Sequence, residues 1–232
     1  MDNYWKQLFD NNVELFKGQP YQQVGKTVNG IAVNAQQLMI VAENVVNLLH
    51  LTAPETVFDL CCGNGLITEL VAQSVNKVIA VDFSAGLIAT AKGASTANNI
   101  DYLVGDVPEL SSVFFQQASK CYLYDALAFF SSAKFAQLLT NLAQSGMQRV
   151  MIGCVPDQEK IWDYYDTDEK KQFYWQREEK NQPHMGKWWG KNEVADLAAQ
   201  YGYKVQFFNQ PPALVTAYYR FDCLLQKETH SR

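Results

Sequence analysis

The chain has 232 residues, of which 48% are hydrophobic and 19% are charged, and its formal net charge is −5 at pH 7. This length and composition indicate a globular protein with one sizeable core, and they exclude a disordered or collagen-like chain. Because the chain has neither a long basic run nor an apolar run long enough to span a bilayer, we expect neither nucleic acid nor a membrane as a partner.

The N-terminus and the cysteines predict a reducing, cytoplasmic setting. The first ten residues lack the apolar core of a secretory signal peptide. The cysteines show neither a metal-binding spacing nor a secreted disulfide framework, so we expect no metal site and mostly buried, reduced thiols. They are Cys61, Cys62, Cys121, Cys154 and Cys223. The oligomeric state is left open by the sequence.

Residues 1–51 predict two helices joined by a polar loop. Apolar side chains recur at helical spacing over residues 3–17 and again over 33–49. The loop at 21–30 contains Lys26, whose side chain either faces solvent or pairs with a carboxylate of a bound ligand. We therefore predict that 1–51 forms a helical cap, with a lid loop, on a core that follows it.

Residues 56–82 predict a strand, a glycine turn, a helix and a second strand. The apolar, β-rich residues Val57, Phe58 and Leu60 are typical of a strand that is buried on both faces. The turn is Cys61-Cys62-Gly63-Asn64-Gly65, and the second strand ends on Asp82. In a βαβ unit of this kind the turn faces a ligand, and the acid that ends the second strand accepts hydrogen bonds from ribose hydroxyls.

The run Asp59-Leu60-Cys61-Cys62-Gly63-Asn64-Gly65 resembles the first motif of class I S-adenosylmethionine-dependent methyltransferases, which usually has glycine in place of Cys61. A dinucleotide fingerprint needs glycines at 61, 63 and 66, and only Gly63 matches. The resemblance implies S-adenosylmethionine as cofactor, whose sulfonium and ammonium cations suit the acidic strand end. The cofactor contacts that it implies in this region are Asp59, Cys61, Gly63, Gly65, Asp82 and Phe83.

A third strand is predicted at 100–104, and an acid follows it. The resemblance implies that Asp106 binds the adenine amino group and that the backbone amide of Val107 meets the ring, with Gly105 beside them. The fourth strand, 121–125, ends in Tyr124 and Asp125, which are expected at the same ligand-facing edge.

Strands and helices continue to alternate, which predicts a parallel sheet covered on both faces. The short break at Pro211-Pro212 predicts a hairpin, so the last strand should run antiparallel. The resemblance implies a Rossmann-like α/β fold with a seven-stranded, mostly parallel sheet, whose core is 52–232. The later elements that we expect are a helix capped by Ser132, a strand at 149–155, a helix capped by Asn192, a strand at 203–208 and a long β-rich run at 213–226 that forms the last strand.

Residues 156–190 form an aromatic-rich insert between the fifth strand and its helix. The insert contains four of the five tryptophans, together with His184. An insert at this place lies on the ligand-facing edge of the sheet, so its aromatic side chains either wall a substrate pocket or pack the insert onto the cap.

Methyl transfer requires an aligned acceptor and, for some acceptors, removal of a proton. His184 and Asp125 are the candidate bases, and Tyr219 and Arg220 either bind an anionic substrate or face outward. The predicted function is methyl transfer to an oxygen or nitrogen of a small molecule. The alternatives are an NAD(P)-dependent oxidoreductase and a non-catalytic protein that binds S-adenosylmethionine.

Overall fold

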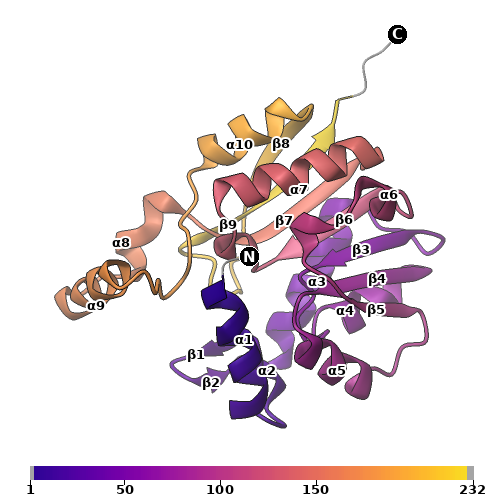
Figure 1. The fold of residues 1–232 in the computed structure, drawn as a ribbon. Coiled ribbons are helices and arrows are strands. Elements are labelled where there is room, and N and C mark those ends of the chain that lie inside the picture. The colour runs from indigo at the N-terminus through magenta and orange to yellow at the C-terminus, as the bar shows by residue number, and fades with distance from the viewer. Residues whose placement is uncertain (1–2, 229–232) are drawn as a thin grey trace.

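The computed structural model describes residues 3–228 and contains a seven-stranded sheet with helices on both faces (Figure 1). The strands of this sheet are β3 (Thr56–Leu60), β4 (Lys77–Asp82), β5 (Ile100–Val104), β6 (Lys120–Tyr124), β7 (Arg149–Pro156), β8 (Tyr203–Asn209) and β9 (Arg220–Lys227). Their order is β5-β4-β3-β6-β7-β9-β8. Strand β9 is antiparallel to both of its neighbours, and the other pairs are parallel. The predicted mostly parallel sheet with an antiparallel last strand is confirmed, but β9 begins at Arg220 and not at the start of the run from Ala213, because residues 210–219 form an irregular, turn-rich connection.

Two layers of helices bury the two faces of the sheet. One layer comprises α3 (Ala35–Leu49), α4 (Thr68–Val71) and α5 (Ala85–Ala94), and the other α6 (Ser112–Phe115), α7 (Ser132–Ser145) and α10 (Lys191–Gln200). Successive residues of a strand point to opposite faces. Accordingly, Val57 packs in the cluster with α3 and α5, whereas Phe58 and Leu60 pack in the cluster with α7 and α10.

The N-terminal segment contains more structure than the sequence predicts. Helix α1 (Asn3–Leu15) agrees with the prediction, but the expected loop holds α2 (Pro20–Gln23) and a hairpin of β1 (Thr27–Val28) and β2 (Ile31–Ala32). Asn29 and Gly30 form the hairpin turn with φ of 50° and 77°. Asn-Gly favours such a two-residue turn because both residues tolerate positive φ, so the prediction of a plain loop was wrong.

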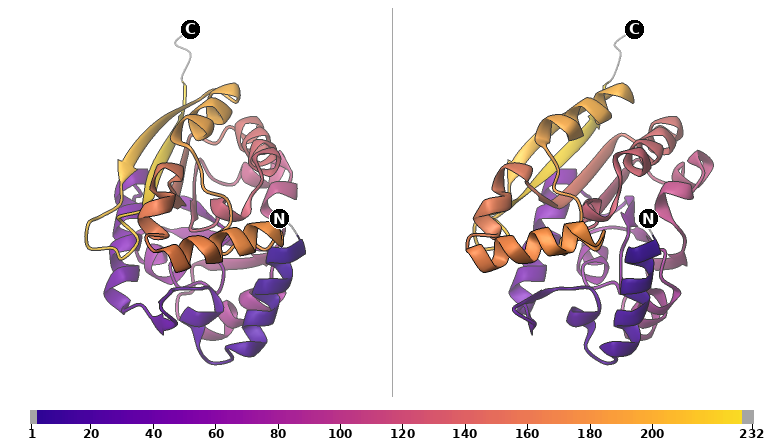
Figure 2. Two further views of the ribbon diagram at one scale, coloured as in Figure 1. Left: turned by 90° about the vertical axis from the view of Figure 1, so that its left-hand side faces the viewer. Right: turned by 60° about the vertical axis from the view of Figure 1, so that its left-hand side comes forward.

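The aromatic-rich insert forms two helices, α8 (Ile161–Tyr164) and α9 (Asp168–Glu179), which lie on the side of the sheet edge where α1 also lies (Figure 2). Arg177 of α9 donates a hydrogen bond of 2.7 Å from Nη2 to Tyr4 Oη of α1. Tyr165 and Trp188 of the insert form a separate buried cluster with Tyr219. The insert and the N-terminal helix therefore contact each other, although they are far apart in the sequence.

Helix boundaries differ from the prediction at two caps. Ser131, not Ser132, caps α7, because its extended backbone lets its side chain accept a hydrogen bond from Lys134 N. Helix α10 begins after Gly190 rather than at Asn192. Helix α5 is capped by Ser84, whose side chain accepts a hydrogen bond from Leu87 N. Within residues 3–228, none of the helices is both long and apolar enough to cross a bilayer.

Candidate active site

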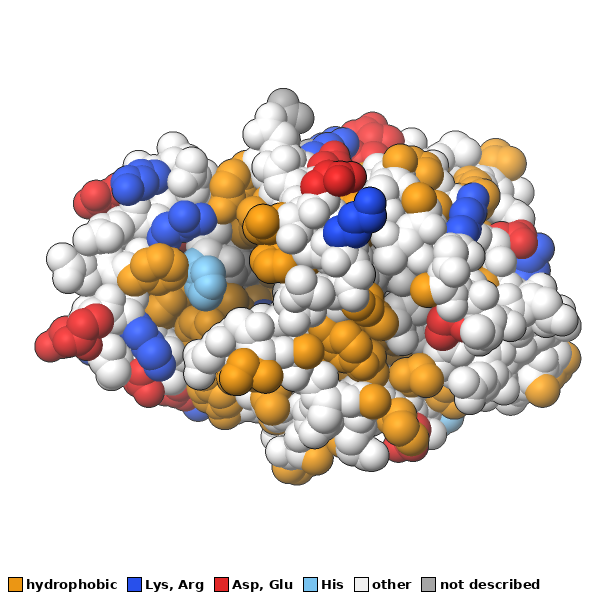
Figure 3. All heavy atoms as spheres, turned by 90° about the horizontal axis from the view of Figure 1, so that it is seen from below, with side chains coloured by type: hydrophobic (Ala, Val, Ile, Leu, Met, Phe, Trp, Pro, Cys, Tyr) orange, Lys and Arg blue, Asp and Glu red, His pale blue; other side chains and the backbone are white. Residues whose placement is uncertain are grey.

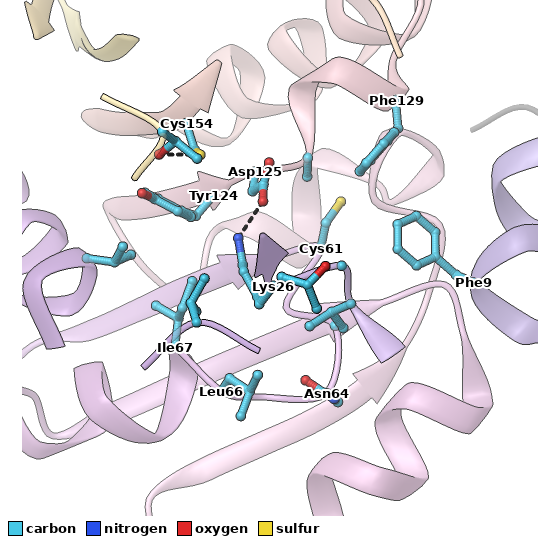
Figure 4. Close-up of a pocket in the computed structure, with 18 of the residues that line it drawn as sticks. Phe9, Lys26, Cys61, Asn64, Leu66, Ile67, Tyr124, Asp125, Phe129 and Cys154 are labelled. Carbon is cyan, nitrogen blue, oxygen red and sulfur yellow. Dashed lines mark hydrogen bonds and ion pairs between the residues drawn. The ribbon is translucent and has the colours of Figure 1, made fainter. Parts of the chain in front are cut away.

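A cavity of about 520 Å³ lies where the carboxyl ends of β3, β4 and β6 meet (Figure 4). Small-molecule sites usually measure about 300–1,000 Å³. Its other walls come from α1, the segment around the β1–β2 hairpin, the insert and the loop before β9. Viewed from below, hydrophobic side chains gather around hollows on this face of the molecule (Figure 3).

Most of the residues that the sequence nominates line this cavity: Lys26, Asp59, Cys61, Gly63, Asp82, Phe83, Tyr124, Asp125 and His184. The nominated residues that are not in its wall are Gly65, Gly105, Asp106 and Val107. Gly65 is needed for packing instead, since a Cβ atom there would lie 2.5 Å from the Tyr102 hydroxyl oxygen. Asp106 accepts a 2.8 Å hydrogen bond from the Lys6 ammonium of α1.

Asp82 fixes the glycine turn against the end of β4. Its two carboxylate oxygens accept hydrogen bonds of 2.9 Å each, one from Gly63 N and one from Ser84 N. Gly63 has φ of +58°, and Cγ1 of Val24 lies 3.0 Å from where its Cβ would be. The turn therefore leaves its backbone close both to the cavity and to the N-terminal segment.

Two buried carboxyl groups, Asp59 and Asp82, lie at one end of the cavity and favour a positively charged ligand there. Thr68 and Tyr122 donate hydrogen bonds of 2.6 and 2.7 Å to the same oxygen of Asp59. Burial raises the pKa of Asp59 to about 7 and that of Asp82 to about 6. Within residues 3–228, neither carboxylate forms an ion pair with lysine or arginine. A cationic ligand would stabilise the ionised form of both groups.

The other end of the cavity holds an ion-pair triad of Lys26, Asp125 and Arg220, hereafter the triad. Lys26 donates to one oxygen of Asp125 and Arg220 donates to the other, and Figure 4 shows Lys26 and Asp125 pointing at each other. Burial alone would raise the pKa of Asp125, but the charges of Arg220 and Lys26 outweigh it and hold that pKa below its ordinary value. Asp125 therefore stays ionised and occupied by two cations.

A β-bulge places Arg220 in the triad. The pairing of β7 with β9 shifts register between Ile152 and Val155, and Cys154 inside this interval has φ of 61°. The bulge exposes the carbonyl oxygen of Cys154, which accepts a 2.9 Å hydrogen bond from Arg220 Nη1. On the other side of the bulge, Cys154 N donates a 2.7 Å hydrogen bond to buried Asp222. The bulge thus anchors the arginine at the cavity wall.

His184 lies at the rim of the cavity and remains partly exposed. Its Nδ1 is 3.4 Å from the hydroxyl oxygen of Tyr165. Partial burial, together with the charges of Arg177 and Arg220, lowers the pKa of His184 below its ordinary value. The ring is therefore neutral at pH 7 and able to accept a proton.

Helix α1 covers the cavity with aromatic side chains that the sequence analysis did not nominate. Phe129, which follows β6, lies 4.6 Å from Trp5 and 5.3 Å from Phe9 between ring centroids. Figure 4 shows Phe9 reaching over from α1 toward the strand ends. The turn also holds the N-terminal segment, since Asn64 donates hydrogen bonds to Pro20 O and Gln23 Oε1. The apolar stripe of α1 was the available signal, but a stripe does not reveal which surface it covers.

Cys61 occupies the position where the resemblance implies glycine, and its φ is 62°. A side chain in this left-handed conformation costs about 1–2 kcal/mol. We expect Cys61→Gly to stabilise the protein by about 1 kcal/mol, measured as a rise in the midpoint of thermal unfolding. Cys62→Gly is the matched control and should destabilise, because Cys62 does not have positive φ. A lower midpoint for Cys61→Gly would contradict the expected strain.

The chain matches a family model described as a methyltransferase domain over residues 57–145. Its structure is similar to magnesium protoporphyrin IX methyltransferase from Synechocystis with bound S-adenosylhomocysteine, at a TM-score of 0.66 and 13% identity, covering 96% of this chain and 99% of that chain. It is also similar to a TehB-like S-adenosylmethionine-dependent methyltransferase from Corynebacterium glutamicum, at a TM-score of 0.60 and 14% identity, covering 94% and 99%. No curated protein sequence matches this chain significantly.

The matched segment contains β3, the glycine turn, and the acids Asp59 and Asp82. These acids form the carboxylate end of the cavity. The solved structures share the sheet with its helical layers over nearly the whole chain. The match and the fold favour a methyltransferase over a nicotinamide-dependent oxidoreductase. Residues 57–145 are therefore similar to a methyltransferase domain, and the fold of the chain is the one found in class I S-adenosylmethionine-dependent methyltransferases.

Proposed function

We propose that the protein transfers the methyl group of S-adenosylmethionine to an oxygen or nitrogen atom of a small-molecule acceptor. The observation that carries this proposal is the single cavity that joins a carboxylate end, at Asp59 and Asp82, to an aromatic end beside the triad. The first end suits the cationic cofactor, and the second leaves room for an acceptor. The contact of α9 with α1 beside the cavity favours a small acceptor over a macromolecule.

In the proposed arrangement the cofactor supplies a methyl carbon that its sulfonium makes electrophilic. Asp59 would hold the cofactor's ammonium group, and Asp82 would accept its ribose hydroxyls, as the buried and unpaired state of both carboxylates supports. Phe83 and the turn residues would border the adenosine. Asp106 would bind the adenine amino group while its carboxylate also pairs with the Lys6 ammonium.

The aromatic end of the cavity would orient the acceptor. Of the two candidate bases, His184 suits proton removal better, because its lowered pKa leaves it neutral. Asp125 is held by two cations, which favours a role in positioning Lys26 and Arg220. An acceptor that is already deprotonated would need neither group as a base.

Calorimetric titration of the purified protein with S-adenosylhomocysteine, and separately with NADH, tests the cofactor assignment. We expect micromolar binding of the first ligand and none of the second. Release of S-adenosylhomocysteine from S-adenosylmethionine in the presence of candidate acceptors then tests turnover. Binding of NADH alone would overturn the proposal. Binding of S-adenosylhomocysteine with no turnover on any acceptor would instead favour a non-catalytic binder.

The raised pKa values of Asp59 and Asp82 predict that cofactor binding strengthens with pH. The ammonium group and the ribose hydroxyls of S-adenosylhomocysteine need ionised carboxylates as acceptors, so this ligand should bind about tenfold or more weakly at pH 5.5 than at pH 8. Stability of the ligand-free protein should move in the opposite direction, because folding favours the protonated acids and their contribution declines as pH rises toward 7. Calorimetry across this range checks the first effect. Asp59→Asn should flatten the pH profile above pH 6.5, and a flat wild-type profile would refute the assignment.

A further inference from the structure

We propose that the acceptor is a small aromatic acid, whose carboxylate binds to Arg220 and Lys26 at the triad end of the cavity. This inference rests on the proposed function, because it concerns the second ligand of the same cavity. Three features of the described residues carry it: the charge balance of this end, the unused hydrogen-bonding capacity of Arg220, and the aromatic rings around it.

The triad end carries an excess of positive charge. Lys26 and Arg220 are the lysine and arginine side chains in the cavity wall, and they share one carboxylate, Asp125. His184 at the rim is neutral and does not change this charge balance. Asp59 and Asp82, the other acids of the wall, belong to the end that we assign to the cofactor. An anionic group on the acceptor would balance the remaining positive charge.

Arg220 has a buried hydrogen-bond donor, its Nε atom, that lacks a partner among residues 3–228. Its side chain is only 9% exposed, and its Nη1 contacts Asp125, the carbonyl oxygen of Cys154 and, at 3.3 Å, the Cys154 sulfur. A buried donor without a partner is unfavourable. The Nε and Nη2 edge of a guanidinium fits the two oxygens of a carboxylate, so an acid in the cavity would satisfy the Nε donor once the Arg220 side chain turns this edge toward it.

Aromatic rings surround the charged groups of this end. Tyr164 and Tyr219 both line the cavity with ring centroids 4.7 Å apart, and Arg220 Cζ lies 5.1 Å from the centroid of Tyr219. On the other side, Lys26 Nζ lies 5.2 Å from the ring of Tyr124. Rings in such positions stack on a planar ligand while the cations hold its charged group. The combination selects an aromatic ring that bears a carboxylate.

Arg149 provides a matched control for Arg220. Its Nε is also buried without a hydrogen-bond partner among the described residues, and its Nη2 donates to Leu48 O. It lies at the start of β7, however, and is not in the cavity wall. If a ligand binds to the arginine in the cavity wall, Arg220 variants should therefore change its affinity, whereas Arg149→Gln should not.

The test is calorimetric titration of protein saturated with S-adenosylhomocysteine, using pairs of aromatic acids and their neutral amides. The pairs are benzoate with benzamide, 4-hydroxybenzoate with 4-hydroxybenzamide, and indole-3-acetate with indole-3-acetamide. We expect at least one acid to bind about tenfold more tightly than its amide, as a charge-assisted bidentate pair implies. Arg220→Gln should abolish this preference, Arg220→Lys should retain part of it, and Arg149→Gln should leave it unchanged.

Each outcome separates this inference from the proposed function. If S-adenosylhomocysteine fails to bind the wild-type protein, the proposed function itself is wrong. If it binds, but every acid and amide pair binds equally or not at all, only the aromatic-acid acceptor is refuted. A preference for acids that survives in a folded Arg220→Gln variant would also refute the assigned subsite. The thermal midpoint of each variant, measured with S-adenosylhomocysteine present, shows that the protein is folded in the titration.

Discussion

Replacing Asp82 with alanine is expected to weaken S-adenosylhomocysteine binding by about 100-fold or more. A hydrogen bond to a charged group contributes about 1.5–3 kcal/mol, and two ribose hydroxyls would lose such an acceptor. The substitution also releases Gly63 N, whose hydrogen bond to Asp82 holds the glycine turn in place. Calorimetric titration of the variant measures the loss directly.

The same substitution carries a cost in folding that must be measured beside it. Gly63 N and Ser84 N both lose their acceptor, at about 1–3 kcal/mol for each donor left buried. The thermal midpoint therefore has to show that the variant is folded at the titration temperature. Asp101→Ala is the control, because this exposed carboxylate lies on neighbouring β5 and pairs with exposed Lys77. Unchanged affinity in folded Asp82→Ala would overturn the assignment of this end to the cofactor.

Replacing Asp125 with alanine is expected to destabilise the protein by about 3 kcal/mol. Removing one partner of a buried ion pair costs about 3–5 kcal/mol, because the other charge is left without compensation. The lower end of this range applies, since 22% of the Asp125 side chain is exposed. Most of the cost falls on Arg220, because its charge is buried, with 9% of its side chain exposed, and the substitution removes its ion-pair partner. Chemical denaturation of the ligand-free protein gives the free energy of unfolding.

Two further variants show whether the triad is the cause. Asp125→Ala combined with Arg220→Met removes the stranded charge and should recover part of the lost stability. Asp163→Ala breaks an exposed ion pair with Lys160 and should change the free energy of unfolding by less than about 1 kcal/mol. An Asp125→Ala variant as stable as Asp163→Ala would show that the triad does not compensate a buried charge.

The sequence by itself determined the features that depend on local pattern. Alternating apolar runs and helical stripes predicted the seven strands and the helices between them, because burial on a sheet or a helix face imposes a period of two or 3.6 residues. The glycine turn and Asp82 are close in the chain, so their proximity in the structure followed from one βαβ unit. The Asn29-Gly30 pair also indicates a hairpin turn by its local conformational preference, although a plain loop was predicted there.

Tertiary structure alone decided the contents of the acceptor end. Asp125 meets Lys26 across 99 residues and Arg220 across 95, and no local periodicity carries information about such pairs. Arg220 reaches the cavity because a bulge forms in the pairing of β7 with β9, which is a property of two strands rather than of either sequence. Likewise, the apolar stripe of helix α1 can be recognised in the sequence, but the surface that the stripe covers cannot. Contacts between distant segments depend on how whole elements pack, so the sequence indicated a cofactor site while the packing created the site for the acceptor.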